Sequence, residues 1–379
     1  MRVLPLNGGA LRVLLTADAV GGVWTYALDL AGGLAALGVE TTLAVLGPAP
    51  ERDQAEAART VPGLALLPTG LPLDWLAETP EQVEAAGAAL AALASEVRAD
   101  LVHLHSPALA AGARFPMPVV ASCHSCVGTW WESVRGGAPL PADFAWRMHL
   151  VAKGSAAADA LIAPSAAFAA ATARSYGLAG PPAVVRNGRR APHPGTRADA
   201  PFAFTAGRLW DEGKNLRALD RAAAHLAGSV RVVAAGATAG PGGASVALRH
   251  IRTLGRLSGE AVALRLAGRP VFVTAALYEP FGLSVLEAAQ AGCALVLSDI
   301  PTFRELWDGA ADFVPADDDR AFAAAIGRAA HDAGHRARRG EAARARSERF
   351  TVEAMAAGTD AVYRSLLRRA ERPGETAAA

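Results

Sequence analysis

Short apolar runs alternate with longer segments of helical periodicity along almost the whole chain. Leu11–Thr16 has the continuous apolar character of a buried strand, and a turn at Gly21-Gly22 follows it. The next apolar positions lie three or four residues apart, which predicts a helix that ends at Gly38. The same pattern predicts strands at Thr42–Leu46, Leu64–Leu67, Leu101–His105, Val119–Cys123, Leu161–Ala163 and Ala183–Arg186, and long helices at Pro80–Val97 and Ala142–Ala158.

A second series of strands and helices begins at Phe202. The segment before it, Asn187–Pro201, has three prolines, two glycines and no apolar periodicity, so we place a linker at 188–201. A final helix at about Thr351–Arg369 has no sheet partner of its own. The strands of the second series are expected at Phe202–Ala206, Val230–Ala235, Val271–Thr274 and Ala294–Ser298, and its helices at Asn215–Leu226 and Leu283–Ala291.

Strands joined by helical crossovers imply parallel sheets, and two such series imply two domains. We therefore expect an α/β fold with two doubly wound Rossmann-like domains facing a cleft, over 1–187 and 202–350. A chain of 379 residues suits two domains of ordinary size. Its 52% hydrophobic and 19% charged residues supply two cores and exclude a disordered or fibrous chain.

The charge balance argues against a general nucleic-acid binder. The formal net charge is +1, made of −4 in residues 1–187 and +5 in the remainder. The three cysteines cannot form a disulfide framework in a chain of this size, which indicates a reducing compartment. The sequence starts without a signal-peptide layout, and no run of 18 strongly apolar residues indicates a transmembrane segment. We expect a soluble cytoplasmic protein.

Two cations follow the first strand of the second series. Arg208 comes directly after Phe202–Ala206, and Lys214 comes six residues later. The carboxyl ends of parallel strands face the ligand crevice, where an arginine fork and a lysine could neutralise a diphosphate. Only two of the 37 basic residues are lysines, so Lys214 stands out, although a solvated loop pair is the alternative.

Two carboxylates flank a predicted helix start in the same half. Glu279 lies in the loop after Val271–Thr274, and Glu287 lies about one turn inside the helix that begins at Leu283. The free amides of that helix start suit an anion, and the carboxylates suit sugar hydroxyls. The alternative is a helix-terminal charge at Glu287 and a surface loop residue at Glu279.

Three histidines lie near the ends of two neighbouring strands of the first series, where we expect them to face the same cleft as Gly21-Gly22: His103, His105 and His124. A bare Gly-Gly can bind an anion through its amides, but on spacing alone a tight turn is the favoured interpretation. Cys123 and Cys126 match C-x-x-C, for which a redox pair or a zinc site is conceivable. We expect these two cysteines to be packing residues and expect no metal site.

Six motifs occur in order along the chain: GGV at Gly21–Val23, the strand ending at His124, NG at Asn187-Gly188, GRL at Gly207–Leu209 with Lys214, E-x7-E from Glu279 to Glu287 inside YEPFGLSVLEAAQAG, and REL at Arg304–Leu306. Together they resemble the retaining glycosyltransferases of family 4, which have the GT-B fold. Arg189 and Arg190 follow NG, where the family usually has an acidic residue.

The resemblance implies a metal-independent retaining transfer of a hexose-type sugar from a nucleoside-diphosphate sugar, with no cofactor. Arg208 and Lys214 would bind the diphosphate, Glu279 the donor sugar and Glu287 the ribose. Gly22 would approach phosphate or acceptor. The resemblance also implies that the final helix, at about 351–372, crosses back onto the first domain. The remaining donor contacts would be made by the backbone amides of Phe281, Gly282 and Leu283.

The acceptor side is expected in the first domain, because every donor motif lies in the second. His124 would lie beside the reacting sugar, with Arg208, Lys214 and Glu279 completing the catalytic group. We assign Trp130, Trp131 and His105 to the acceptor side, since tryptophan faces stack well on sugar C–H surfaces. The acceptor itself, whether a small molecule, a glycan or a lipid-linked molecule, is open. A GT-B epimerase, a phosphorylase and a catalytically inactive sugar-nucleotide binder are the alternative functions.

Overall fold

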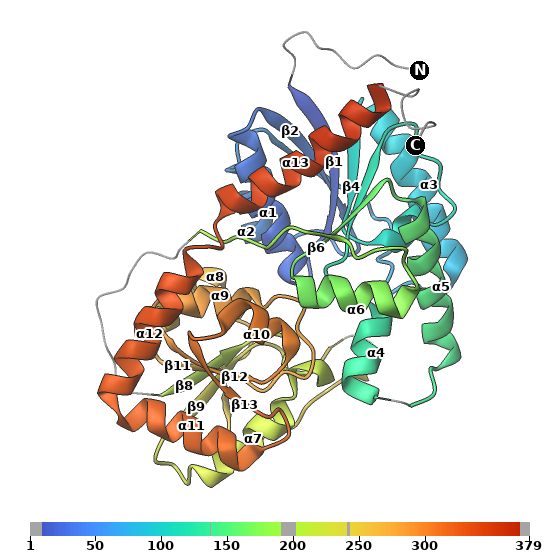
Figure 1. Cartoon of the computed structure of the whole chain (residues 1–379). Helices are drawn as coiled ribbons and strands as arrows, with labels where there is room; N and C mark the ends of the chain where they lie inside the picture. The colour runs from blue at the N-terminus through green and yellow to red at the C-terminus, as the bar shows by residue number, and fades with distance from the viewer. Residues whose placement is uncertain (1–9, 137, 191–201, 241–242, 372–379) are drawn as a thin grey trace. The chain divides into compact units, whose positions relative to one another are not determined.

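The computed structural model describes residues 10–136, 138–190, 202–240 and 243–371 (Figure 1). Of the linker predicted at 188–201, the part from 191 onward lies outside the described residues. The described residues group into two compact units. Unit 1 comprises those within Met1–Trp131, Gly137–Gly188 and Val352–Ala379, and unit 2 those within Glu132–Gly136 and Arg189–Thr351.

Unit 1 contains a seven-stranded sheet in the order β3-β2-β1-β4-β5-β6-β7, and every pairing in it is parallel. The strands are β1 Leu11–Asp18, β2 Val39–Leu46, β3 Leu64–Pro68, β4 Leu101–Leu104, β5 Val119–Ser122, β6 Ala160–Ala163 and β7 Ala183–Val184. The helices are α1 Gly22–Ala35, α2 Arg52–Arg59, α3 Pro80–Glu96, η1 Pro107–Ala110, α4 Val127–Arg135, α5 Ala142–Ala157, α6 Ala166–Tyr176 and α13 Val352–Glu371.

Both faces of this sheet are buried, because alternate side chains of each strand point in opposite directions. In β1, Val13 and Leu15 join a core that includes residues of α1 and α13. Leu14 between them joins a second core with residues of α3, η1 and α5. The continuous apolar run of β1 is therefore the signature of a strand covered on both faces.

The last helix, α13, packs on α1 within unit 1. Gly33 of α1 lies at the closest approach, where an added Cβ would come 2.7 Å from the Ala356 Cβ. Tyr363 of α13 is fully buried and Met355 is nearly so. The final helix therefore completes one core of the N-terminal sheet, although more than 160 residues of unit 2 precede it in the chain.

Unit 2 contains a six-stranded parallel sheet in the order β10-β9-β8-β11-β12-β13. Its two cores again lie on opposite faces, one with α7 and α11, the other with α9, α10 and α12. The strands are β8 Ala203–Ala206, β9 Val232–Ala235, β10 Arg252–Thr253, β11 Val271–Thr274, β12 Ala294–Ser298 and β13 Ala311–Val314. The helices are η2 Glu212–Lys214, α7 Leu216–His225, α8 Gly259–Ala267, α9 Leu283–Gln290, α10 Pro301–Trp307, α11 Asp319–His331 and α12 Ala333–Ser347.

The predicted α/β class with two parallel sheets is confirmed. The predicted strands β11 and β12 have the expected bounds, and the other predicted elements differ by one to three residues at an end. No element was predicted from the sequence at β10, β13, α2, α4, α6, α8 or α10–α12. Helix α12 shows why, since it buries only Gly340, Ala343 and Ser347 and carries arginines around the rest of its surface.

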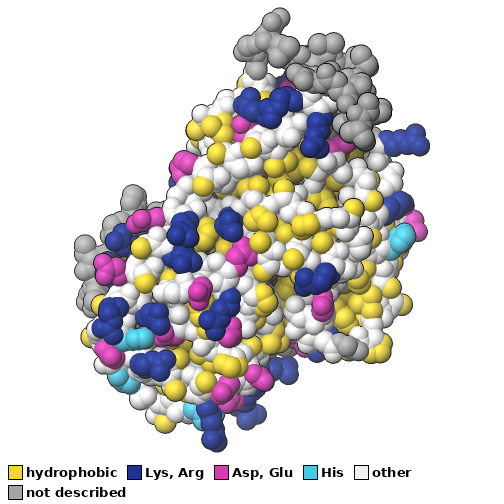
Figure 2. All heavy atoms as spheres, in the orientation of Figure 1, with side chains coloured by type: hydrophobic (Ala, Val, Ile, Leu, Met, Phe, Trp, Pro, Cys, Tyr) yellow, Lys and Arg dark blue, Asp and Glu magenta, His cyan; other side chains and the backbone are white. Residues whose placement is uncertain are grey.

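No helix in the described part of the chain is long and apolar enough to cross a membrane. On the face shown in Figure 2, Lys and Arg side chains are interspersed with Asp and Glu and do not gather into a continuous basic patch. This mixed surface agrees with the near-zero net charge of the chain.

Candidate functional site

The carboxyl-end loops of β8 and β11 are joined into one rigid element of unit 2. The backbone N–H groups of Leu277 and Tyr278 both donate to the carbonyl oxygen of Gly213, over 2.9 and 3.2 Å. The side-chain amide of Asn215 donates to the carbonyl oxygens of Ala275 and Ala316, over 3.0 and 2.9 Å. The turn that carries Lys214 is thus fixed against the loop that carries Glu279.

Lys214 and Glu279 form an ion pair at this junction, as their neighbouring loops allow. The Lys214 Nζ lies 2.5 Å from the Glu279 Oε2, and the side chains are 20% and 15% exposed. The pair joins two residues that sequence reasoning assigned separately, one to a phosphate and one to a sugar. Because the pair is mostly buried, both side chains are held in one geometry.

Arg208 is held by a second carboxylate, which the sequence pattern did not reveal. Its Nη2 lies 3.0 Å from the Asp211 Oδ2, and Asp211 also accepts the backbone N–H of Gly213. Burial alone would raise the pKa of Asp211, but the charges of Arg208 and Lys214 and these hydrogen bonds outweigh it and lower the pKa. An ionised Asp211 therefore orients Arg208 and adds a negative charge near Lys214, beside the end of β8.

Helix α9 begins at the same edge of the unit 2 sheet. Its N-cap, Gly282, has a φ of +92°, a left-handed conformation that favours glycine. Phe281 anchors the turn, since it is buried with its ring edge-on to Phe350 at 5.6 Å. No side chain of the described residues caps this helix start. The first amides of α9, including that of Leu283, therefore present the positive end of the helix to a ligand.

Glu287 lies one turn into α9 and pairs with Arg189. The Arg189 Nη2 and Nε lie 2.7 and 3.0 Å from the Glu287 Oε1. The side-chain amide of Gln290 donates to the carbonyl oxygen of Arg189 over 2.8 Å. The sequence showed Arg189 only as a departure from the pattern after Asn187-Gly188, because a partner 98 residues away leaves no local signal.

This part of unit 2 has the composition of a site for a phosphorylated sugar compound. Two oriented cations and an uncapped helix start attract phosphate oxygens. Two ionisable carboxylates, Glu279 and Glu287, can accept hydrogen bonds from hydroxyl groups. Among the described residues, no group of His, Cys, Asp and Glu is arranged to hold a metal ion.

In unit 1, the turn between β1 and α1 is stabilised by Asp18. Its Oδ1 accepts the backbone N–H groups of Val20 and Gly21, over 2.8 and 3.1 Å. Gly22 then begins α1, which has no side-chain cap among the described residues. The Gly21 amide is therefore used within the turn. Of the two glycines, only Gly22 remains a candidate for contacting a ligand.

The three histidines do not form one cluster facing a ligand, and the expectation for His103 is wrong. His103 lies inside β4, fully buried, with Nδ1 2.6 Å from the Tyr363 hydroxyl and Nε2 2.6 Å from the Ser122 hydroxyl. Burial lowers the pKa of His103 to about 3, so it is a neutral structural residue. The helix that supplies Tyr363 covers this face of the sheet, which is why His103 is enclosed.

His105 lies just past β4 in a buried polar network. Its Nδ1 lies 2.7 Å from the Thr16 hydroxyl, which also accepts the backbone N–H of His105. The Thr16 hydroxyl thus holds both the backbone and the ring of His105, and the other ring nitrogen is Nε2. That nitrogen lies 3.9 Å from the Asp74 Oδ1. With an exposed fraction of 6%, His105 is largely occupied by the fold.

His124 follows β5 by two residues and packs edge-on against Tyr26, with ring centroids 4.4 Å apart. Burial, with smaller contributions from His103 and His105, lowers its pKa to about 3, so the imidazole is neutral at physiological pH. Among the described residues its Nε2 has no hydrogen-bond partner. A neutral imidazole with an unused nitrogen is suited to contacting a ligand hydroxyl.

The aromatic residues after His124 form a half-buried cluster on α4 and α5. Trp131 and Phe144 have ring centroids 5.2 Å apart, and Trp130 stacks near Phe144 at 6.4 Å. The indole N–H of Trp131 donates to the Ala138 carbonyl oxygen over 2.9 Å. Trp146 instead packs against the core of unit 1. The structure therefore separates Trp146 from the two tryptophans of α4.

Burial raises the pKa of both the Cys123 and Cys126 thiols, although the hydroxyl of Thr129 partly offsets it for Cys126. The Cys126 Sγ lies 2.8 Å from the Thr129 Oγ1. Redox and zinc chemistry both require a thiolate, which this environment disfavours.

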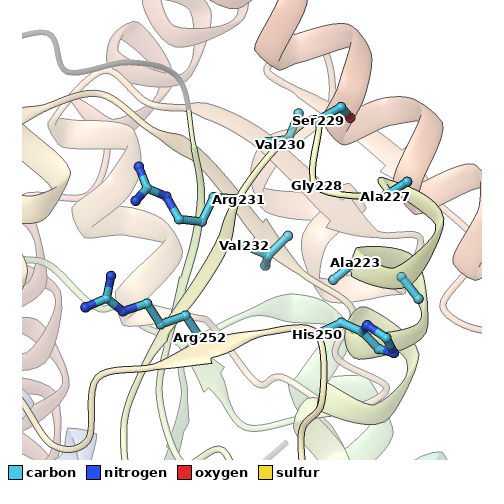
Figure 3. Close-up of a pocket in the computed structure, with 10 residues that line it drawn as sticks. Ala223, Ala227, Gly228, Ser229, Val230, Arg231, Val232, His250 and Arg252 are labelled. Atoms are coloured by element: carbon cyan, nitrogen blue, oxygen red, sulfur yellow. The ribbon is translucent and has the colours of Figure 1, made fainter.

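A cavity of about 630 Å³ lies at the opposite end of the unit 2 strands, between the start of β9 and the end of α7. Figure 3 shows Arg231 and Arg252 extending together on one side of β9, whereas His250 lies on the other. The basic side chains that line the cavity therefore do not converge on one point. Because ligands of open α/β sheets bind at the carboxyl ends of strands, we assign no donor role to this cavity.

Family models match both halves of the chain. Residues 20–190 match the model of Glycosyltransferase Family 4, and residues 200–332 match that of Glycosyl transferases group 1. No curated protein matches the chain by sequence.

Solved structures match over nearly the whole chain. A sucrose-phosphate synthase from Thermosynechococcus elongatus has a TM-score of 0.76 at 18% identity, covering 94% of this chain and 99% of that one. Anabaena Alr3699/HepE, solved with UDP and glucose, has a TM-score of 0.70 at 17% identity, covering 94% and 100%. An α,α-trehalose 6-phosphate synthase from Burkholderia multivorans has a TM-score of 0.66 at 16% identity, covering 95% and 100%. At these identities the matches establish the GT-B fold.

Proposed function

Because the chain is a glycosyltransferase with the GT-B fold, we propose that it transfers a hexose-type sugar from a nucleoside-diphosphate sugar with retention at the anomeric carbon. The observation that carries this proposal is the Lys214–Glu279 ion pair beside the uncapped start of α9, with Glu287 one turn further on. A cation, a helix N-terminus and two carboxylates then match the phosphates, the sugar and the ribose of one donor molecule.

Each group of the site has a role that follows from its charge. Arg208 and Lys214 bind the diphosphate, together with the amides of Phe281, Gly282 and Leu283. Glu279 accepts hydrogen bonds from the hydroxyls of the donor sugar, and its contact with Lys214 holds it next to the phosphate that the sugar leaves. The resemblance to family 4 glycosyltransferases implies these same roles, and the contacts of Arg208 and Lys214 in unit 2 support them.

The proposed reaction is metal-independent because the protein itself supplies the positive charge. As the bond between the anomeric carbon and the phosphate oxygen breaks, negative charge grows on the diphosphate and positive charge on the sugar ring. Arg208, Lys214 and the α9 amides are preorganised to stabilise the diphosphate, and Glu279 stabilises the ring. The acceptor hydroxyl attacks from the face that the diphosphate leaves and gives its proton to the departing phosphate oxygen, so the anomeric configuration is retained.

For the acceptor side we propose the region of unit 1 that contains His124, Trp130 and Trp131. The neutral His124 offers a hydrogen bond to a hydroxyl near the reaction centre, and the α4 tryptophans offer apolar faces to an acceptor. His105 contributes indirectly, since it fixes the end of β4 through Thr16.

The test begins with donor binding. Anabaena Alr3699/HepE was solved with UDP and with UDP-glucose, so these are the first ligands to compare with GDP- and ADP-sugars by thermal shift. Turnover of the donor that stabilises the protein most is then followed in the presence of EDTA, and the anomeric configuration of the product is read by NMR. An inverted product, or turnover lost to EDTA and restored by a metal ion, would contradict the proposal.

The acceptor assignment is tested by comparing two tryptophans. Trp131→Ala should raise the KM for the acceptor while the Kd for the donor stays the same. Trp146→Phe, at a core position, is the matched control and should leave the acceptor KM unchanged. His124→Ala should lower kcat by a larger factor, because a positioned group at a reaction centre acts mainly in the transition state. Wild-type turnover by a folded His124→Ala variant would exclude this part of unit 1.

A further inference from the structure

We propose that Arg189 is a positioning residue for the donor nucleotide: it holds the Glu287 carboxylate in the orientation that accepts the ribose hydroxyls. The inference rests on the proposed function, because it assumes that Glu287 faces the ribose. It adds a residue from the segment between the two sheets to a site otherwise built from the loops and helices of unit 2.

The side-chain contact is specific in its geometry. Two of the three guanidinium nitrogens, Nε and Nη2, reach the same carboxylate oxygen, Oε1 of Glu287, over 3.0 and 2.7 Å. A carboxylate offers about four lone-pair positions, so one charged partner on Oε1 is compatible with hydroxyl donors on the same group. The Arg189 and Glu287 side chains are 23% and 22% exposed, which limits the screening of the pair by water.

The backbone of Arg189 is anchored as well. Its carbonyl oxygen accepts the side-chain amide of Gln290 over 2.8 Å, and its N–H donates to the Phe350 carbonyl oxygen over 3.3 Å. Gln290 lies three residues after Glu287 on α9, so both contacts come from one side of that helix. Phe350 packs against Phe281, which anchors the start of the same helix. The guanidinium therefore projects from a fixed point.

These contacts matter for nucleotide binding in two ways. A carboxylate that is already ordered loses less side-chain entropy when a ribose binds to it. A neighbouring positive charge also lowers the cost of removing Glu287 from water when the nucleotide covers it. Both effects predict that loss of Arg189 lowers the affinity for the nucleotide. They also predict that a nucleotide that does not contact Glu287 loses no affinity.

The adjacent arginine provides a matched control. Arg190 is exposed, and its side chain has no hydrogen-bond or ion-pair partner among the described residues. The two residues carry the same charge at neighbouring positions, so any long-range electrostatic effect on a diphosphate would be similar for both. Only Arg189 contacts the carboxylate assigned to the ribose.

The experiment is titration calorimetry with the nucleoside diphosphate that stabilises the wild type most, chosen among UDP, GDP and ADP, and with its 2′,3′-dideoxy analogue. Arg189→Ala should raise the Kd of the ribonucleotide about tenfold and that of the dideoxy analogue less than about twofold. Arg189→Lys should recover part of the affinity, and Arg190→Ala should stay within about twofold of wild type for both ligands. In a Glu287→Gln background, Arg189→Ala should have almost no further effect on the ribonucleotide.

Each contrary outcome is distinct. Equal affinities for Arg189→Ala and Arg190→Ala would overturn the role of Arg189. An equal loss for the ribo- and dideoxynucleotides would indicate a structural role instead, and tighter binding by Arg189→Ala would show that the arginine competes with the ribose. A wild-type protein that binds none of the three nucleoside diphosphates would overturn the proposed function and this inference with it. The folding of each variant is read from its melting temperature in the same buffer.

Discussion

Replacing Lys214 by alanine should affect two measurable quantities, the affinity for the nucleoside diphosphate and the unfolding free energy of the protein. Lys214 contributes one charged donor, already oriented by a 2.5 Å contact with Glu279. A hydrogen bond to a charged partner contributes roughly 1.5–3 kcal/mol. Because 1.4 kcal/mol corresponds to a factor of ten, the Kd for the nucleoside diphosphate should rise roughly 10- to 150-fold in Lys214→Ala. Titration calorimetry with the cognate nucleoside diphosphate measures this directly.

The same variant leaves the Glu279 carboxylate, with a side chain 15% exposed, without its cation. Breaking a fully buried ion pair from one side costs about 3–5 kcal/mol. Since Glu279 keeps some contact with water, we expect a smaller loss, about 1–2 kcal/mol of unfolding free energy. The double variant Lys214→Ala/Glu279→Gln removes the unpaired charge, so it should regain most of the melting temperature while nucleotide affinity stays low.

The chain's other lysine gives a close control. Lys153 pairs with Glu84 over 2.7 Å on the surface of unit 1. Lys153→Ala removes the same functional group from a more exposed pair and should leave nucleotide affinity unchanged. The reasoning is refuted if Lys214→Ala binds the nucleoside diphosphate as tightly as wild type, or if both lysine variants lose the same affinity.

Three further predictions concern the carboxylates, the cysteines and a buried histidine. Glu287→Gln should weaken both the nucleoside diphosphate and the nucleotide sugar, whereas Glu279→Gln should weaken mainly the nucleotide sugar and turnover; equal loss of nucleoside-diphosphate affinity in the two variants would contradict this division. Replacing Cys123 and Cys126 together by Ala should leave activity within a few-fold, and stoichiometric zinc in the wild type or activity that switches with dithiothreitol would contradict a packing role. Burial lowers the pKa of His103 to about 3, so the unfolded chain takes up the proton first as the pH falls below 6.5. This group should lower the unfolding free energy by about 1.4 kcal/mol per pH unit between pH 6 and 4, measured by denaturation at each pH against His103→Gln.

The layout of strands could be predicted from the sequence because parallel strands covered on both faces are continuous apolar runs. Val271–Thr274 is such a run, and its observed bounds equal the predicted ones. β13 escaped prediction because Asp312 interrupts its apolar pattern. In the fold that carboxylate is satisfied by His335 and Arg339 of α12, at 2.6 and 2.8 Å.

The candidate donor residues could be predicted because they stand next to strand ends and a helix start, where local sequence fixes their place. Lys214 and Glu279 are of this kind, and the structure brings them together. Their supporting partners could not be predicted. Asp211 looks like any loop carboxylate until its contact with Arg208 is seen, and Arg189 gains its partner only when α9 packs beside the segment that follows β7.

The histidines of unit 1 show how the same residue type acquires different roles within a few positions. His103 and His105 are two residues apart. The expected strand Leu101–His105 contains both, so the sequence places them at one edge of the sheet. His103 is enclosed because α13, 260 residues later in the chain, brings Tyr363 to its Nδ1. No periodicity within the strand reports a helix that returns from so far away. A substitution at His103 should therefore reduce the stability of unit 1, and turnover would fall only as the folded fraction falls. A substitution at His124, whose Nε2 has no partner among the described residues, should lower turnover with the folded fraction preserved.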